Sequence, residues 1–357
     1  MNNKRLIELK QLLKKKQLSH ILISDLVDVE YTGGFRSSNA SLLISSQENY
    51  LFSDFRYKES AEEYCRKNPE WKFILVKEQI YSSIGSYIPE GSVLGVQSNY
   101  LTLDNYKDLS SYITNVSFVQ LSDEISDLFI SKTEEEIASM QQAASIADNA
   151  LERLWADVKE GISEIEIARK LDRICGDLGS EKPSFETIVL FGPRAALPHG
   201  RPGKSTLKTG DWILIDFGCT VNGFCSDMTR TVVMGSANSE QKRIYEIVLR
   251  AQKSALSAAR AAMKSKDLDS IARTIIENEG FGEEFGHALG HGVGIRIHEN
   301  PRISYRSEVI LPENAVITIE PGIYVQGFGG IRIEDMIVLK NDGAITLSKS
   351  PKELIEL

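Results

Sequence analysis

The stretch Asp211-Trp-Ile-Leu-Ile-Asp216-Phe-Gly-Cys-Thr-Val-Asn-Gly-Phe-Cys-Ser-Asp227-Met-Thr-Arg-Thr231 decides the fold of the second half of this chain. An apolar, β-prone run ends at Asp216, Asn222-Gly223 is a strong hairpin-turn signal, and a second segment returns through Asp227. A hairpin brings both carboxylates within reach of one point. Two buried carboxylates that lie close together repel, so one stays protonated unless a cation neutralises them. A bound metal ion would satisfy both, and a solvated turn with two unrelated acids is the alternative from this stretch alone.

The residues before this stretch predict a separate domain. A length of 357 residues is enough for two domains of ordinary size. Over about 120 N-terminal residues, short apolar strands alternate with amphipathic helices, which is typical of a compact α/β domain. Strands are expected at 21–23, 39–45, 50–53, 71–76 and 92–96, and helices at 5–18, 57–67 and 103–112.

The pattern changes near residue 131. Thr133-Glu-Glu-Glu136 is a capping box, which predicts a helix to about Lys159 that ends at Gly161. Ser163-Glu-Ile-Glu166 repeats the signal and predicts a second helix to about Leu178. We therefore place a boundary within residues 123–132 and divide the chain into domains 1–125 and 126–357.

Composition and charge narrow the class of protein. The chain is 42% hydrophobic and 25% charged, which is usual for a soluble globular protein, and it lacks the long apolar run of a transmembrane helix. Its N-terminus lacks the apolar core of a secretion signal. The net charge of −9 argues against nucleic acid as the main partner. Four cysteines without framework spacing predict free thiols in a reducing cytoplasm, and Cys219 and Cys225 are expected to be small buried residues.

The second half gathers histidines and acids at the ends of apolar runs. A strand is expected at 187–190, Ser239 is expected to cap a helix over 240–263, a second helix follows at 267–279, and further strand-like runs end in acids near residues 320 and 334. Four of the five histidines lie in glycine-rich, irregular sequence, and they are His199, His287, His291 and His298. Several titratable groups in one half of a chain are a stronger signal for a site than a lone histidine.

These acids suit a site for two metal ions. A carboxylate has two oxygens and can bridge two ions roughly 3.5–4 Å apart. The carboxylate ligands would be Asp216, Asp227, Glu320 and Glu334, with His291 as the single nitrogen ligand. Such an oxygen-rich set favours Mn²⁺, Co²⁺ or Zn²⁺ over a thiolate-type site. The alternative is that Glu320 and Glu334 are edge-strand acids, although their apolar flanks make unpaired burial costly.

Five motifs in order resemble the pita-bread metallopeptidases of family M24, in the branch of Xaa-Pro aminopeptidases and prolidases. They are Asp216…Asp227-Met-Thr-Arg, His287…Gly-His291-Gly-Val-Gly, His298-Glu-Asn-Pro301, Thr318-Ile-Glu320-Pro-Gly322 and Gly-Ile-Arg332-Ile-Glu334-Asp335. The resemblance covers about residues 130–350. Tyr31-Thr-Gly-Gly-Phe and Asp54-Phe-Arg-Tyr57 resemble the creatinase-like N-domain of that branch. The resemblance as a whole implies an α/β creatinase-like domain followed by an α+β pita-bread catalytic domain.

The resemblance also implies roles for the site residues. The five residues named above as ligands match the ligands of two divalent ions, with Mn²⁺ expected first and Co²⁺ or Zn²⁺ as alternatives. His199 matches a substrate contact, His298 matches a residue that steadies the scissile carbonyl, and His287 and Arg332 match outer partners of the ligands. Glu320 matches a proton shuttle. A metal-bridging hydroxide would hydrolyse the bond before proline in Xaa-Pro dipeptides or at Xaa-Pro N-termini of peptides.

Three other functions are weighed against this one. A methionine aminopeptidase typically lacks the N-domain, and a creatinase-type hydrolase needs no metal, whereas all five ligand positions are intact here. A non-catalytic binding module on the same fold is the third, and such relatives lose ligands. The resemblance further implies a homodimer that acts on short proline-containing peptides, while the composition and net charge predict no membrane or nucleic-acid partner.

Arg302 raises the question of substrate length. A dipeptidase benefits from a cation that holds the free carboxylate of the C-terminal proline, and prolidases of similar length carry an arginine at a matching place. We therefore expect Arg302, four residues after His298, to bias the enzyme towards dipeptides. The alternatives are that Arg302 is a surface residue or pairs with Glu299.

Overall fold

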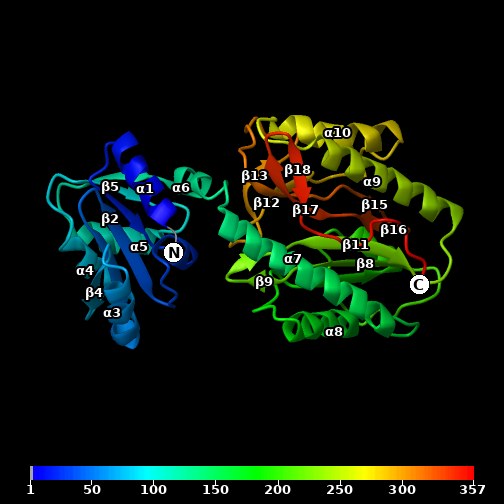
Figure 1. The fold of residues 1–357 in the computed structure, drawn as a ribbon, viewed down its shortest axis with the longest axis horizontal. Coiled ribbons are helices and arrows are strands. Elements are labelled where there is room, and N and C mark those ends of the chain that lie inside the picture. Colours follow the sequence, from blue (N-terminus) through cyan, green and yellow to red (C-terminus); the bar gives the residue numbers. More distant parts are fainter. Residues whose placement is uncertain (1–2) are drawn as a thin grey trace. The chain divides into compact units, whose positions relative to one another are not determined.

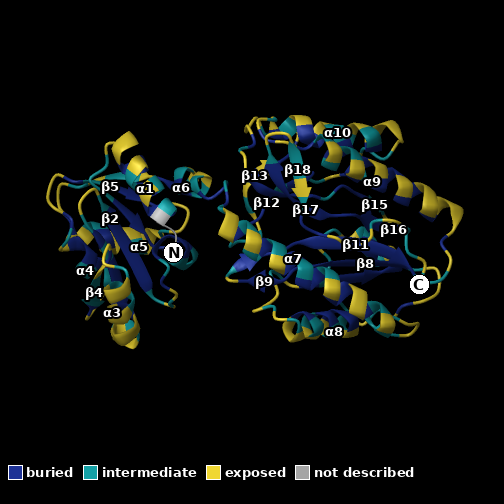
Figure 2. Cartoon of the chain, in the orientation of Figure 1, coloured by how far each residue is buried: buried dark blue, intermediate teal, exposed yellow. Residues whose placement is uncertain are grey.

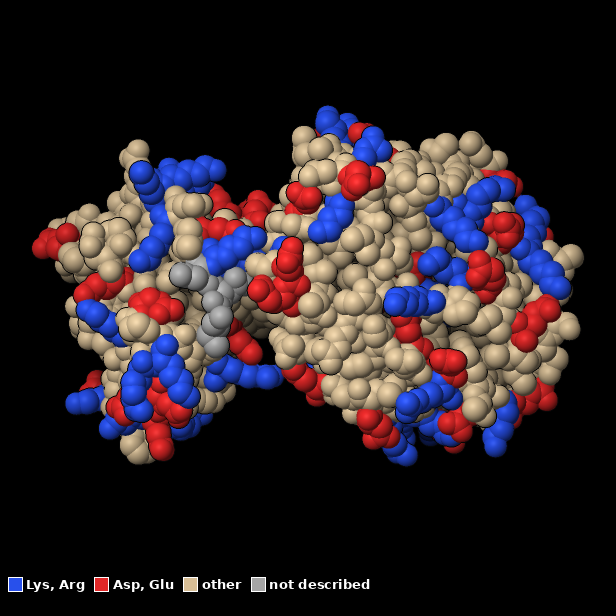
Figure 3. Space-filling view, viewed as in Figure 1, with Lys and Arg blue, Asp and Glu red and all other residues tan. Residues whose placement is uncertain are grey.

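The computed structural model describes residues 3–357 and shows two compact units, Met1–Phe129 and Ile130–Leu357 (Figure 1). The division falls after residue 129, inside the region 123–132 where the sequence predicts a boundary. No helix in the described part of the chain is both long and apolar enough to cross a membrane. On the face shown in Figure 3, lysine and arginine side chains are interspersed with acidic ones.

The first unit is a six-stranded mixed sheet with helices around it. Its strand order is β4-β3-β2-β1-β5-β6, in which β2 is antiparallel to both neighbours and the other pairs are parallel. The strands are β1 (His20–Ile23), β2 (Ala40–Ser45), β3 (Asn49–Asp54), β4 (Lys72–Val76), β5 (Val93–Val96) and β6 (Ser117–Gln120). The helices are α1 (Asn3–Lys15), α2 (Leu26–Gly33), α3 (Lys58–Lys67), α4 (Ile80–Gly85), α5 (Leu103–Tyr112) and α6 (Ser122–Leu128). The α/β expectation is confirmed, although the short elements α2, α4, β6 and α6 were not predicted.

The second unit holds a three-stranded sheet, β11-β8-β7, and a five-stranded sheet, β13-β12-β14-β17-β18. The hairpins β9–β10 and β15–β16 complete the strands. The strands of the two sheets are β7 (Ile188–Phe191), β8 (Trp212–Phe217), β11 (Met228–Val233), β12 (Gly290–Gly292), β13 (Glu299–Ile303), β14 (Val316–Ile319), β17 (Asp335–Lys340) and β18 (Gly343–Thr346). The hairpin strands are β9 (Thr220–Val221), β10 (Phe224–Cys225), β15 (Gly322–Val325) and β16 (Gly329–Arg332).

Two helix pairs enclose these strands, as Figure 1 shows. They are α7 (Glu134–Leu154) with α8 (Glu164–Asp177), and α9 (Ser239–Ala258) with α10 (Ser265–Asn278). In Figure 2 the strands are buried while the helices are exposed along their outer faces. This is the α+β arrangement that the resemblance implies, with the strands as a middle layer.

Strand β8 divides its side chains between two hydrophobic cores. Trp212 and Leu214 pack in the core that contains α9 and α10, whereas Ile213 and Ile215 pack in the core that contains α7 and α8. Side chains alternate across a strand. Asp216 therefore lies on the same face as Leu214, away from α7 and α8.

Three predicted helix boundaries are wrong, one in α7 and two in α9. Helix α7 ends at Leu154 and continues only as a short 3₁₀ turn to Asp157, so Gly161 (φ 83°) lies in the following turn and is no helix cap. Helix α9 is capped by Asn238 instead of Ser239 and ends at Ala258 instead of residue 263. The Asn238 side chain accepts from the Gln241 N–H, and Gln241 reaches back to the Asn238 N–H, so the capping box forms one residue earlier.

The predicted acidic hairpin is confirmed. Strand β8 pairs with β11 antiparallel, and β9 pairs with β10 at the tip, where Asn222 (φ 50°) and Gly223 (φ 80°) both adopt the left-handed conformation of a tight hairpin turn. Between these two ladders the strands approach closely at Gly218, where an added Cβ would lie 1.8 Å from the Ser226 carbonyl oxygen. Asp216 and Asp227 flank this close approach.

We predict that Gly218→Ala destabilises the second unit by about 1–3 kcal/mol, because the new methyl group overlaps backbone that cannot move away independently. The matched control is Gly176→Ala in helix α8, where a Cβ meets no atom within 4 Å. That control is expected to be neutral or up to about 1 kcal/mol stabilising. Chemical denaturation of both variants measures the difference, and equal stabilities would contradict the close approach.

Candidate metal centre

The five predicted ligand residues come from five separate places in the second unit. Asp216 lies near the end of β8, Asp227 directly precedes β11, and His291 is the middle residue of β12. Glu320 directly follows β14, and Glu334 lies between β16 and β17. The pairing of β8 with β11 and of β14 with both β12 and β17 brings these chain positions together.

The side chains of these residues converge on one buried site. Ligand atoms of Asp227, His291 and Glu334 all lie within 4.8 Å of one another, a spacing that suits a metal ion. His291 Nε2 is 3.6 Å from Asp227 Oδ2 and 3.4 Å from Glu320 Oε1. Asp216 also lies close, since its charge acts on both Asp227 and Glu334.

The hydrogen bonding of His291 leaves one ring nitrogen for a ligand. Its Nδ1 lies 3.0 Å from the Gly292 carbonyl oxygen, which can only accept a hydrogen bond, so Nδ1 carries the proton. Burial lowers the pKa of His291, which keeps the ring neutral. The Nε2 lone pair therefore points towards the carboxylates, as in a metal-binding histidine.

The carboxylates repel one another in the protein without a cation. Burial, followed by the charge of Glu334, raises the pKa of Asp227 well above its usual range, and burial with Glu320 does the same for Glu334. Burial raises the pKa of Glu320 to about 7. Asp216 Oδ1 is buried and has no hydrogen-bond partner within residues 3–357. A buried carboxylate oxygen without a donor is costly, and a cation would satisfy it.

Arg332 is the centre of a hydrogen-bond network behind the carboxylates. Its Nη2 donates to Asp216 Oδ2 (2.6 Å), and its Nε donates to Thr229 Oγ1 (2.9 Å). Thr229 in turn donates to Glu334 Oε2 (2.5 Å). Arg332 Nη1 donates to the Tyr324 hydroxyl (2.8 Å). One arginine thus orients two carboxylates and leaves their other oxygens facing the site.

Three residues of this site were not predicted from the sequence. Thr229 and Tyr324 belong to the network above, and Thr318 donates to Glu320 Oε1 (3.0 Å) while it accepts from the His291 N–H (3.0 Å). Thr229 and Thr318 each lie two residues from an acid, so strand alternation places them on the same face as that acid. That spacing is the signal that could have identified them.

The other predicted histidines lie around the carboxylates. The His298 ring is 4.5 Å from the His291 ring, measured between centroids. His199 is exposed and is close enough to act electrostatically on Glu320, His287 and His298. His287 Nδ1 donates to the Ala288 carbonyl oxygen (2.8 Å), so Nε2 accepts from the Tyr324 hydroxyl (3.0 Å). His287 thus extends the Arg332 network, and burial lowers its pKa to about 4.

A buried ion pair holds the loop that carries His298. Lys132 Nζ lies 2.7 Å from Glu299 Oε2, and both side chains are at most 9% exposed. The other carboxylate oxygen of Glu299 accepts from the Arg296 N–H (3.0 Å). The suggested alternative pairing of Arg302 with Glu299 is therefore wrong. Arg302 is exposed on β13, and its guanidinium forms no hydrogen bond or ion pair with the described residues.

The donor set fits divalent cations. Four carboxylates and one neutral imidazole supply mostly hard oxygen ligands, which suit Mn²⁺, Co²⁺ or Zn²⁺. Burial, together with the charges of neighbouring carboxylates, raises the pKa of three of these carboxyl groups, and bound cations would offset both effects. Cys219 and Cys225 are buried free thiols nearby in the hairpin, as expected, and they are absent from the group of ligand atoms.

The chain matches two known sequence families. Residues 138–341 match Metallopeptidase family M24, and residues 5–128 match the Creatinase/Prolidase N-terminal domain. A Xaa-Pro dipeptidase of Pyrococcus furiosus is 39% identical over 354 residues, which cover 98% of this chain and 99% of that protein.

Solved structures agree with these matches. The structure of a Xaa-Pro dipeptidase from Bacillus anthracis superimposes with a TM-score of 0.94 at 33% identity and covers 99% of both chains. An X-Pro aminopeptidase from Thermotoga maritima superimposes with a TM-score of 0.90 at 34% identity, over 99% of this chain and 100% of that one.

We predict that divalent ions stabilise the protein against heat, because they relieve the repulsion between buried carboxylates. At a free Mn²⁺ concentration about 100 times the dissociation constant, the gain is about 2.7 kcal/mol, or roughly 5–10 °C for a unit of this size. Calorimetry with and without EDTA measures the gain.

The matched variant is Asp227→Asn. The amide needs no proton to stay neutral in the buried site, whereas Asp227 must take one up on folding, so the variant should raise the stability of the metal-free protein and reduce the gain from Mn²⁺. An equal gain in both proteins would mean that the ion binds elsewhere.

Proposed function

The chain belongs to metallopeptidase family M24, and from this premise we propose that it is a two-metal exopeptidase that hydrolyses the bond before proline. Its substrates would be Xaa-Pro dipeptides or peptides that begin with Xaa-Pro. One observation supports this proposal most strongly. The side chains of Asp216, Asp227, His291, Glu320 and Glu334 lie close together, in a chain that is similar to a Xaa-Pro dipeptidase over nearly its whole length.

The five residues would hold two divalent ions, with Mn²⁺ as the proposed native metal. When bound, such ions polarise a carbonyl group and lower the pKa of a water molecule. Asp216 supports this assignment because its Oδ1 has no partner while Arg332 occupies Oδ2. The fixed position of His291 Nε2 supports it further, since the ligand needs no rearrangement before it binds an ion.

Glu320 is proposed as the group that carries the proton. Its carboxylate lies 3.4 Å from His291 Nε2, and Thr318 holds one of its oxygens. A carboxylate in this position can accept a proton from the attacking water and pass it to the leaving nitrogen of proline. A positioned acid–base group of this kind contributes about 10²–10⁴-fold to a rate.

His298 and His199 are proposed to contact the substrate. Both side chains are exposed and lie beside the carboxylates, and the ion pair between Lys132 and Glu299 fixes the loop of His298. A donor in this place can stabilise negative charge that develops on the scissile carbonyl oxygen. His287 and Arg332 would act through the ligands that they orient. The homodimer stays a prediction from the resemblance, and the cytoplasmic location stays a prediction from the cysteine pattern.

We predict that the purified protein cleaves Xaa-Pro dipeptides, that EDTA abolishes cleavage, and that Mn²⁺, Co²⁺ or Zn²⁺ restores it. Glu320→Gln should still fold and lose at least about a hundredfold in kcat, because the amide cannot accept the proton. The assay follows free proline, with metal content measured on the same samples. Near-normal turnover in Glu320→Gln with metals bound would overturn its role. No cleavage of dipeptides or longer Xaa-Pro peptides by the metal-loaded protein would overturn the substrate class.

We also predict that Arg302→Ala impairs cleavage of dipeptides more than cleavage of longer Xaa-Pro peptides, because only a dipeptide places a free carboxylate next to the proline ring. The effect should fall mainly on KM, since a carboxylate contact of this kind stabilises substrate and transition state alike. Arg260→Ala is the control, as Arg260 is also exposed but lies at the end of α9. Unchanged kinetics in Arg302→Ala for both lengths would exclude this role.

A further inference from the structure

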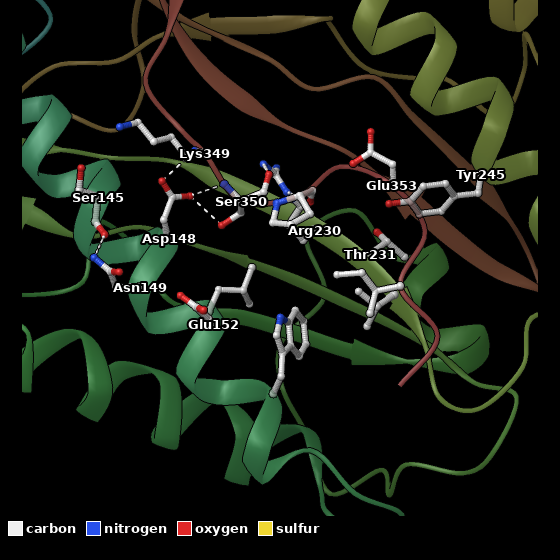
Figure 4. A pocket seen from close by; sticks show the side chains of 15 residues that line it. Ser145, Asp148, Asn149, Glu152, Arg230, Thr231, Tyr245, Lys349, Ser350 and Glu353 are labelled. Carbon is white, nitrogen blue, oxygen red and sulfur yellow. Dashed lines mark hydrogen bonds between the residues drawn. The ribbon is translucent and has the colours of Figure 1, made fainter.

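A cavity lies on the opposite face of strand β11 from the metal centre. It has a volume of about 530 Å³ and is bounded by α7, β11 and the C-terminal segment around residues 349–355 (Figure 4). Val232 lines it and belongs to the α7–α8 core, whereas Thr229 faces Glu334 on the other side of the strand. Its volume is within the range of sites for small molecules.

Most charged groups in the cavity wall already have partners. All five N–H groups of Arg230 donate to oxygen atoms of the protein, namely Pro351 O, Thr229 O, Glu334 O, Asp335 Oδ1 and Ser350 O. The Asp148 carboxylate accepts from the backbone N–H groups of Lys349 and Ser350. Neither side chain is therefore available to bind a ligand.

The Glu152 carboxylate, the Lys349 ammonium group and the Trp155 indole N–H are among the wall groups that have no partner within the described residues. The Glu152 carboxylate is exposed and forms no hydrogen bond or ion pair with the described residues. Trp155 directly follows α7, and its indole N–H donates to no acceptor among them. Glu353, across the cavity from Glu152 in Figure 4, pairs with Lys253. Lys349 extends away from the space in the same view. Glu152 thus supplies the unpaired charge beside the space, because the Lys349 ammonium group points away from it.

The remaining wall is apolar and aromatic. Leu151, Val232 and Ile355 supply aliphatic surface, and Trp155 and Tyr245 supply two aromatic rings. The Tyr245 hydroxyl cannot donate to a ligand, because it already donates to the Lys352 carbonyl oxygen (2.8 Å). Aromatic faces attract organic cations, and an unpaired carboxylate adds a counter-charge.

We propose that this cavity binds a small hydrophobic amine, with its ammonium group at Glu152 and its apolar body between Trp155 and Tyr245. A carboxylate ligand is disfavoured because every donor of Arg230 is used. The site is separate from the metal centre and does not depend on the peptidase activity.

The wall of this cavity is connected to the metal centre. Arg230 Nη1 donates to the Glu334 carbonyl oxygen (2.5 Å), and Arg230 Nη2 pairs with Asp335 (2.7 Å). Asp335 is fully buried and also pairs with Lys352. A ligand that packs against Arg230 would therefore contact the residue that fixes the backbone of a proposed metal ligand.

The test uses 2-phenylethylamine with the full-length protein, followed by tryptophan fluorescence and by calorimetry. We expect saturable binding that is about three- to fivefold weaker in Glu152→Gln, as an exposed ion pair contributes modestly. Glu135→Gln removes an exposed charge from the same helix outside the cavity and should leave binding unchanged. Trp155→Phe should remove most of the fluorescence change, because Trp155 lines the cavity, whereas Trp71 belongs to the first unit and Trp212 is buried behind Tyr245, on which its ring stacks.

The neutral analogue 2-phenylethanol tests whether charge is recognised, and it should bind more weakly than the amine. Equal binding of the two compounds would overturn the assignment of Glu152. Absence of saturable binding, or equal affinity in the wild type and Glu152→Gln, would overturn the site itself. If the amine bound at the metal centre instead, the wild type and Glu152→Gln would show equal affinity, because Glu152 lies outside that centre.

Discussion

Four carboxylates share one buried site with a single arginine, so negative charge exceeds positive charge there. Much of the second unit serves to hold these like charges close together. Arg332 pairs directly with Asp216 and reaches Glu334 through Thr229, so Asp227 and Glu320 have no cation of their own. Burial, together with the charges of neighbouring carboxylates, raises the pKa of both groups, to about 7 for Glu320. Such an arrangement is unfavourable unless divalent cations replace the protons.

The fold keeps this unfavourable site in place by spreading its support over several elements. Gly218 lets the two strands of the acidic hairpin approach, and Arg230 anchors the backbone of Glu334 from the opposite face of the strand. Buried pairs such as Lys132 with Glu299 fix the loop around the site, and loss of one partner in such a pair costs roughly 3–5 kcal/mol. The two flanking helix pairs cover the strands and exclude water from their cores.

Local signals explain what could be predicted from the sequence. The Asn222-Gly223 turn and the capping boxes at Thr133 and Ser163 depend on neighbouring residues only, and the structure contains all three. The cap of α9 was misplaced by one residue because Asn238 and Ser239 are both good caps, and only the partner at Gln241 decides between them. Motif resemblance predicted the five proposed ligands, whose side chains the fold brings close together. The network through Thr229 and Tyr324 and the cavity beside Glu152 depend on tertiary packing between distant segments, which no local pattern encodes.

The central claim is that two divalent ions bind between the side chains of five residues, Asp216, Asp227, His291, Glu320 and Glu334. A crystal structure of the protein grown with Mn²⁺, with the ions located by their anomalous scattering, tests it most directly. The account predicts two ions, roughly 3.5–4 Å apart, with Asp216 Oδ1 bound to one of them. A single ion, or ions bound away from these carboxylates while the site stays protonated, would contradict it.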